Sequence, residues 1–184
     1  EEQAFVLLER HRREQEGAIE AAVYLRQLVD QGYLDDRLLT RILSYRDEIA
    51  GHEFGSISLL VDAEYAYAFQ QYETNVLKFR QFLASDAARL PLNLNLYHYH
   101  FAVSLYQIGL TRDSMQVIEK LRASPLLARD LKAPLAKLYF IVANAMYESQ
   151  ATNAFAQQLE TAASGFVDVA PDDPDIASAH MALA

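Results

Sequence analysis

The chain contains no cysteine and no tryptophan, and only six glycines and five prolines among its 184 residues. The lack of cysteine excludes disulfides, thiolate nucleophiles and cysteine-ligated zinc. It does not decide the compartment, because a cysteine-free chain suits the periplasm as well as the cytoplasm; we expect a cytoplasmic protein. The scarcity of glycine leaves few flexible loops in which a catalytic site could be built.

Long apolar runs and positive charge are also lacking. No stretch of eighteen uninterrupted apolar residues exists, so the sequence predicts no membrane span. The chain has 16 basic and 25 acidic residues, a net charge of -9 and an isoelectric point near 5.0. We therefore expect no direct binding to nucleic acid, because phosphate backbones require a positive surface.

The charge is unevenly distributed. Residues 101–150 hold six basic and four acidic residues, whereas the rest of the chain is acidic. This region is either an ordinary solvated face or a docking patch for an acidic partner. Its basic residues are Arg112, Lys120, Arg122, Arg129, Lys132 and Lys137.

Motifs with a known chemistry are absent as well. The sequence has no phosphate-binding glycine loop, no GxSxG nucleophile elbow and no HExxH metal motif. Glu48 and His52 have a spacing that can place two ligands on one helix face, but no third ligand is near in sequence. His11 lies in a charged run typical of an exposed helix. We expect no enzyme, no cofactor and no metal site.

Helix-forming residues dominate what is present, and the scarce glycines and prolines separate apolar stripes of helical spacing. The sequence predicts an all-α fold of about eight helices joined by short connections, forming one domain over residues 1–184. Because the chain begins at Glu1, we expect it to be a fragment of a longer protein. The predicted helices are 3–31, interrupted or divided near Gly17, then 35–49, 57–87, 93–109, 112–123, 128–149, 152–165, and a last one from about 174.

Residues 95–128 resemble a tetratricopeptide repeat, a helix-turn-helix unit of 34 residues. Gly109 matches the turn glycine, Ser114 the small residue of the second helix, and Pro125 the closing proline. The remaining matches are the packing residues Phe101, Ala102 and Leu105 of the first helix and Ile118 and Leu121 of the second.

A looser second unit follows at about 135–168, so the resemblance covers residues 95–168. Its turn has no glycine, and its closing proline, Pro171, comes late. The matching residues are Leu138, Ile141, Val142 and Ala145 in the first helix and Ala154, Leu159 and Ala162 in the second. The resemblance implies antiparallel helix pairs that stack into a right-handed α-solenoid; an irregular helical bundle is the alternative.

The run "YHYH" at 97–100 raises the question of a metal site. On a strand, His98 and His100 would share a face and could bind one ion; on a helix they point about 200° apart and cannot. The longer spacing of Leu94, Tyr97 and Phe101 favours the helix. We then expect His98 to be a packed or hydrogen-bonded interior residue.

In tetratricopeptide proteins, the first helices of successive pairs line a groove that receives peptides or partner helices. The resemblance assigns groove positions to Leu96, Tyr99, Val103 and Tyr106 in the first unit, and to Ala136, Tyr139, Ala143 and Met146 in the second. An equally good interpretation places the tyrosines in an ordinary core.

The leading hypothesis is a protein-interaction or scaffold module, in the style of bacterial helical repeats, with a protein or peptide as its partner. The alternative is a regulatory sensor or dimerisation domain of a signalling or transcription-regulating protein. That domain would bind a small ligand between helices, or form a homodimer through the apolar stripe of 57–87.

Overall fold

The computed structural model describes residues 57–85 and 93–183 of the chain. All regular structure in these residues is helical, which confirms the all-α prediction for this part of the chain. The chain divides into two compact units between Leu92 and Asn93, and each unit is described here by itself. The helices predicted at 3–31 and 35–49 lie outside the described residues, and the single-domain prediction stays a prediction.

The described part of the first unit is a hairpin of two helices, α4 (Ile57–Ala68) and α5 (Tyr72–Leu83). The prediction of one helix over 57–87 is therefore wrong. The chain turns at Phe69–Gln71, where Gln70 adopts a positive φ of 57°. The apolar spacing continues through the turn because both helices bury one face. No glycine or proline marks the turn, so the sequence pattern indicated a single helix.

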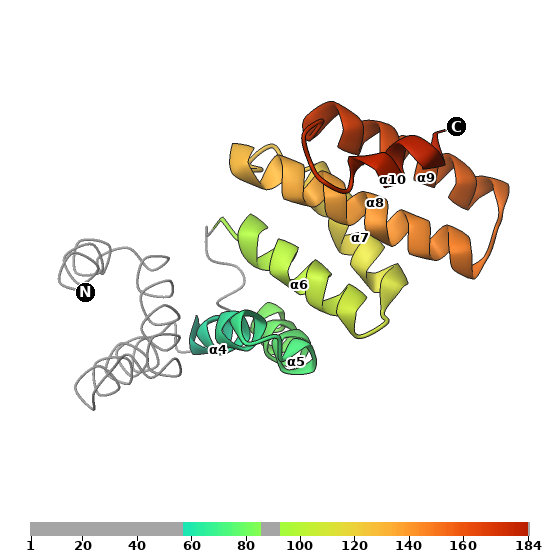
Figure 1. The fold of residues 1–184 in the computed structure, drawn as a ribbon. Coiled ribbons are helices and arrows are strands. Elements are labelled where there is room, and N and C mark those ends of the chain that lie inside the picture. Colours follow the sequence, from blue (N-terminus) through green and yellow to red (C-terminus); the bar gives the residue numbers. More distant parts are fainter. Residues whose placement is uncertain (1–56, 86–92, 184) are drawn as a thin grey trace. The chain divides into compact units, whose positions relative to one another are not determined.

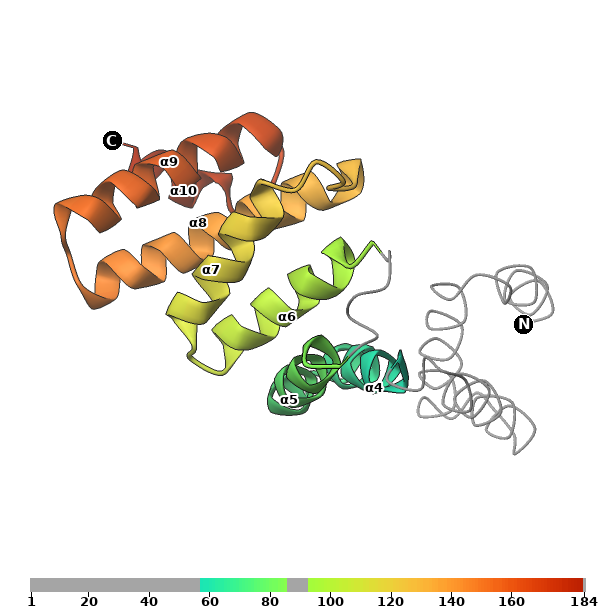
Figure 2. The same ribbon diagram turned by 180° about the vertical axis from the view of Figure 1, so that it is seen from behind.

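The second unit contains α6 (Asn95–Gln107), α7 (Thr111–Arg122), the short 3-10 helix η2 (Arg129–Leu131), α8 (Lys132–Ser149), α9 (Asn153–Val169) and α10 (Ile176–Ala182). These helices confirm the predicted ones to within a few residues. Figures 1 and 2 show α6 paired with α7 and α8 with α9, with α10 lying against α9. Helix α7 also packs on α8, which joins the two pairs.

The core of the second unit combines aromatic rings with alanines at the helix crossings. Phe140 on α8 stacks on Phe166 of α9, with ring centroids 5.8 Å apart. Ala143, Ala162 and Ala163 are completely buried beside them. Small side chains at a crossing let the helix backbones approach closely, and these alanines lie in the buried core of the unit.

In the α4–α5 and α6–α7 hairpins, an equivalent side-chain-to-backbone hydrogen bond joins the two helices. Asn75 Nδ2 donates to the carbonyl of Ala63 at 2.8 Å, and Ser114 Oγ donates to the carbonyl of Ala102 at 2.8 Å. In both hairpins a buried polar side chain of the second helix thus holds the backbone of the first at a buried alanine. The matching residues are 39 positions apart (63 to 102 and 75 to 114).

The turns of the two hairpins match in the same register. Gly109 has a φ of 81° and lies 39 positions after Gln70, the positive-φ residue of the first turn. In both turns, the residue after the positive-φ residue donates its N–H to a helix carbonyl five residues earlier. Gln71 donates to Ala66 and Leu110 to Leu105, both at 2.8 Å. This is the Schellman helix ending, which favours glycine at the left-handed position. The described residues therefore contain a structural repeat of 39 residues.

The repeat predicts opposite effects at its two turn positions. Gly109→Ala should destabilise the fold by about 1 kcal/mol, because a left-handed backbone is unfavourable for any residue with a Cβ. An added Cβ would have no atom within 4 Å, so the cost is purely conformational. Gln70→Gly should stabilise the fold by about 0.5 kcal/mol, since glycine's extra freedom in the unfolded chain offsets part of the gain.

Urea denaturation followed by circular dichroism measures both changes. Leu77→Gly, at an exposed position inside α5, is the control and should destabilise instead. Equal signs for Gln70→Gly and Gly109→Ala would contradict the shared turn.

Candidate functional site

A hollow of about 440 Å³ opens between α6 and α8 in the second unit. Tyr99, Val103 and Tyr106 supply its wall on α6, which spaces them by four and three residues along one helix face. Its other wall comes from the first half of α8 and from the α9–α10 loop. These lining residues are Ala133, Pro134, Lys137, Leu138, Ile141 and Asp173, with Gln107 at the end of α6.

A larger hollow of about 780 Å³ lies on the neighbouring side of α8, between α8, α9 and α10. Phe140, Asn144 and Glu148 line it from α8, and Asp175 and Met181 from the C-terminal segment. Tyr106, Lys137 and Ile141 line both hollows. The two hollows therefore adjoin, and together they form a groove along α6, α8 and α10, which we call the α8 groove.

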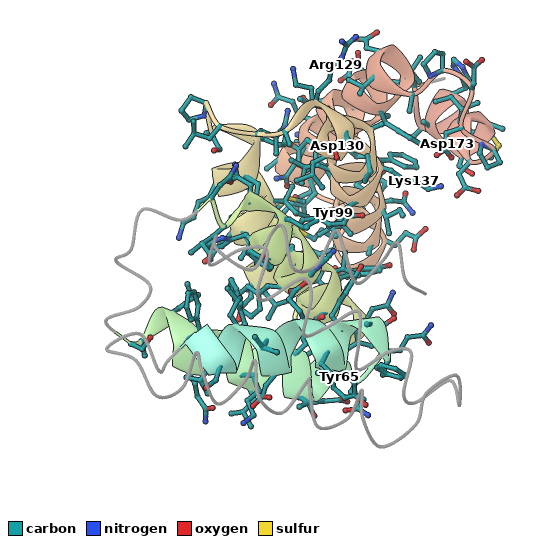
Figure 3. The ribbon with its side chains drawn as sticks, turned by 90° about the vertical axis from the view of Figure 1, so that its left-hand side faces the viewer. Tyr65, Tyr99, Arg129, Asp130, Lys137 and Asp173 are labelled. Carbon is teal, nitrogen blue, oxygen red and sulfur yellow. The ribbon has the colours of Figure 1, made fainter. Side chains whose placement is uncertain are left out.

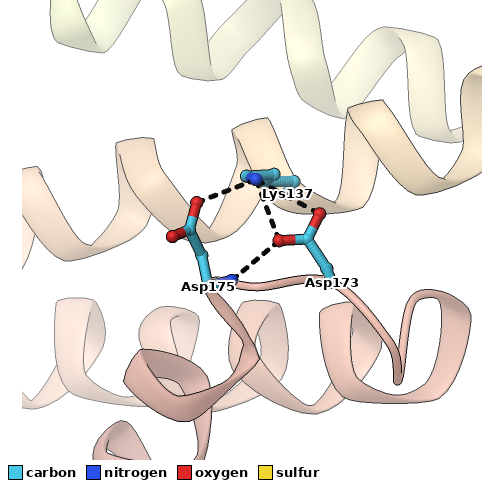
Figure 4. A network of polar contacts seen from close by, with 3 residues as sticks. All are labelled: Lys137, Asp173 and Asp175. Atoms are coloured by element: carbon cyan, nitrogen blue, oxygen red, sulfur yellow. Dashed lines mark hydrogen bonds and ion pairs between the residues drawn. The ribbon is translucent and has the colours of Figure 1, made fainter.

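Three charged residues meet where the two hollows adjoin, and we call them the Lys137 clasp (Figure 4). The Lys137 ammonium donates to both carboxylate oxygens of Asp173, at 2.9 and 3.1 Å, and lies 2.8 Å from Oδ2 of Asp175. The Asp175 N–H donates to Oδ1 of Asp173 at 2.9 Å. The clasp thus attaches the α9–α10 loop to α8.

The clasp and its surroundings shift three pKa values. Hydrogen bonds to Asp175 and Asp173 raise the pKa of Lys137, and the bond from Lys137 lowers the pKa of Asp173. Burial raises the pKa of Tyr99, although the positive charge of Lys137 acts in the opposite direction. Figure 3 shows Tyr99, Lys137 and Asp173 on α6, α8 and the α9–α10 loop. The positive charge of Lys137 therefore interacts electrostatically with Tyr99, which is part of the aromatic wall of the groove.

The structure brings together three of the predicted groove residues: Tyr99, Val103 and Tyr106 all line the α8 groove. Leu96 is half-buried and lines neither hollow. Ala136 is also half-buried outside them.

Tyr139, Ala143 and Met146 lie in the core, not on the groove surface. Tyr139 lies under the guanidinium of Arg122 on α7, which sits 3.9 Å from the ring centroid. This side of α8 faces α7, and the helix presents the opposite side, with Lys137 and Ile141, to the groove. The faces of α8 thus differ from those that the resemblance assigned.

The second repeat unit differs from its predicted pattern in two further ways. Ala154, assigned to the small buried position, is exposed, whereas Leu159 and Ala162 are buried as predicted. Ile141 and Ala145, assigned to the core, are half-buried and line the groove. The turn before α9 has no residue with positive φ; instead, Thr152 Oγ1 accepts a hydrogen bond from the Phe155 N–H at 3.3 Å.

His98 lies on α6, which confirms the helical interpretation of "YHYH". Its Nδ1 is 2.9 Å from the carbonyl of Leu94, so it is the hydrogen-bonded interior histidine that was expected. Burial lowers its pKa, and the charge of Lys120 lowers it further against the opposing effect of the Leu94 bond. The neutral form of His98 is therefore favoured over the charged form, and its ring is tied to the backbone of its own helix.

Sequence reasoning missed Lys137, Asp173 and Asp175 as a unit. From the sequence, Lys137 stands out only as part of a basic stretch, and no site is predicted in the "VAPDDPD" segment before the last predicted helix. The residues are 36 and 38 positions apart, and only folding of α9 back along α8 brings them together. No local spacing signals such a contact.

The part of the chain that the structure describes contains neither a candidate metal site nor a candidate membrane span. There, no three His, Cys, Asp or Glu side chains are grouped so that they could hold a metal ion. No helix among residues 57–85 and 93–183 has both the length and the apolar character needed to cross a membrane. Glu48, His52 and His11 lie outside the described residues.

Comparison with known proteins gives no relative. No protein-family model matches the chain, and neither a curated protein nor a solved structure matches it significantly.

The Lys137 clasp predicts a pH-dependent contribution to stability. The hydrogen bond from Lys137 holds the pKa of Asp173 below its ordinary value, so its charge stabilises the fold above about pH 4, and this is lost as pH falls through the lowered pKa. The pKa of Lys137 is above 10.5, so its contribution is present below about pH 10 and is lost as pH rises through the raised pKa.

Asp173→Asn should therefore lower the melting temperature between about pH 4 and 10, by a small amount because the clasp is partly exposed. The difference from wild type should shrink as the pH falls through the lowered pKa of Asp173. Thermal melts across this range measure it, with the neighbouring exposed Asp172→Asn as the control. A difference that stays constant down to pH 2 would contradict the clasp.

Proposed function

We propose that the chain is a protein-interaction module that binds a peptide segment of a partner protein in the α8 groove. The observation that carries the proposal is the groove itself: two adjoining hollows, walled by tyrosines and aliphatic side chains, run along three helices. Peptide recognition needs such an extended, partly apolar surface with few polar contacts.

The residues of the groove suit this role. Tyr99 and Tyr106 offer large apolar area with few rotatable bonds, and each carries a hydroxyl that can bond a peptide backbone. Both are half-buried, so their rings are held by packing while one side stays open to the groove. A partner therefore meets a preorganised wall and orders few side chains on binding.

The repeat supports a tetratricopeptide-like module. The α4–α5 and α6–α7 hairpins share one hydrogen-bond register, and α8–α9 is a further antiparallel pair. The groove is walled by α6 and α8, the first helices of successive pairs, and by α10, which comes next in the chain. In helical-repeat proteins this is the binding surface. The period of 39 residues exceeds 34, and we propose that the longer connections after α5 and α7 account for the difference.

A displayed library of random twelve-residue peptides, selected on the full chain, tests the proposal. We expect peptides to be enriched on the wild type and lost on the Tyr99→Ser/Tyr106→Ser variant, because serine removes most of the aromatic wall. Replacing an aromatic anchor typically costs at least about 2 kcal/mol, or roughly thirtyfold in affinity.

Leu126→Ser is the matched control, since Leu126 is 68% exposed and lines neither hollow. It should keep every selected peptide. Circular dichroism shows whether each variant is folded. Enrichment that survives the double tyrosine change would reject the groove. Failure to enrich peptides, together with concentration-dependent dimers in sedimentation, would favour the sensor or dimerisation hypothesis instead.

A further inference from the structure

The Lys137 clasp carries more negative than positive charge. Its single ammonium faces two carboxylates, so the three residues sum to a net charge of -1. Both oxygens of Asp173 accept bonds from Lys137, and one of them also accepts from the Asp175 N–H. Asp175 touches the ammonium through one oxygen, and its side chain is 64% exposed. The surplus charge is therefore concentrated at Asp175, facing the solvent.

The clasp lies where a bound peptide has to pass. Tyr106, Lys137 and Ile141 line both hollows, with Asp173 on the wall of one and Asp175 on the wall of the other. A peptide that fills both hollows with apolar side chains crosses the clasp between them. Glu148 adds a further carboxylate to the wall of the larger hollow. Across both hollows, one lysine thus stands against Glu148, Asp173 and Asp175.

We infer that the α8 groove selects peptides in which a lysine or arginine is flanked on both sides by apolar residues, with the basic side chain meeting Asp175 at the clasp. This inference rests on the proposed function, because it names the chemistry of the peptide that the groove binds. The apolar residues fill the two hollows, and the basic residue supplies the positive charge that the clasp lacks.

An acidic side chain at the same point is disfavoured for a physical reason. The ammonium of Lys137 is already engaged by both Asp173 and Asp175, so an incoming carboxylate would meet like charge before it could share the lysine. Like charges brought together at an interface reduce affinity and exclude wrong partners. The clasp is thus a charge filter between two apolar sites.

The peptides recovered on the full chain test the inference. Among those that depend on Tyr99 and Tyr106, we expect a lysine or arginine with apolar residues on each side. A representative peptide, resynthesised with capped ends and a dye, should bind about fivefold more weakly when its basic residue is replaced by glutamine, and more weakly still with glutamate. Fluorescence anisotropy measures this, and the preference should shrink at 0.5 M salt.

Variants of the chain locate the effect. Asp175→Asn makes the clasp neutral while keeping its size and backbone N–H, and should remove most of the preference for lysine over glutamine. Asp172→Asn, an exposed acid of the same loop that lines neither hollow, should leave the preference unchanged. Glu148→Gln, on α8 and away from the loop, should reduce the preference in part, and it serves if the loop variant is unstable.

The outcomes separate the two claims. Peptides that depend on the tyrosines but show no basic residue, or prefer an acidic one, would overturn the charge filter and leave the groove intact. The absence of any tyrosine-dependent peptide would reject the proposed function, and the inference with it. A preference for lysine over glutamine that is as strong in both Asp175→Asn and Glu148→Gln as in the wild type would also overturn the inference.

Discussion

The close approach of paired helices at buried alanines is the constraint on which the rest of the structure depends. At the α6–α7 crossing, Ser114 on α7 donates a hydrogen bond to the carbonyl of Ala102, and both residues are completely buried. The bond satisfies a hydroxyl that is fully buried, where an unpaired polar group would cost about 1 to 3 kcal/mol. It also sets the register of the two helices, and so determines which face of α6 turns outward. Tyr99, Val103 and Tyr106 lie on α6 to one side of Ala102, where they form a wall of the groove.

The same constraint operates in α4–α5 with different residues. Asn75 takes the place of Ser114 and Gln70 that of Gly109, yet the hydrogen bonds keep their lengths. Residues 57–84 aligned with 96–123 share only three identical positions: Ala63 with Ala102, Tyr67 with Tyr106, and Ala84 with Ala123. The two hairpins thus share a few small, polar and left-handed positions. The other buried residues of their second helices stay apolar but differ in identity: Val76, Phe79 and Phe82 against Met115, Ile118 and Leu121.

This explains how far the sequence could predict the molecule. Helices bounded by clear signals, such as α7 between Gly109 and Pro125, were placed nearly correctly. The turn at Gln70 was missed, because nothing but the tertiary pairing of α4 with α5 holds a glutamine in a left-handed conformation. On α8, buried residues from Leu135 to Met146 cover most of the circumference of the helix. Helical periodicity then cannot tell the groove face from the core face, and Tyr139 was assigned to the wrong one. The clasp joins residues far apart in sequence, beyond the reach of any local pattern.

The position of the clasp gives it two roles that reinforce each other. Lys137 holds the α9–α10 loop against α8, next to the wall that contains Asp175 and Met181. A basic side chain arriving at Asp175 does not have to displace Lys137, because one Asp175 oxygen is not needed for that ion pair. An incoming carboxylate, by contrast, would compete for Lys137 and loosen the wall on which the peptide rests. Exposed ion pairs contribute little affinity on their own. In the proposed binding mode, the groove gains affinity from its apolar walls and discrimination from the surplus carboxylate between them.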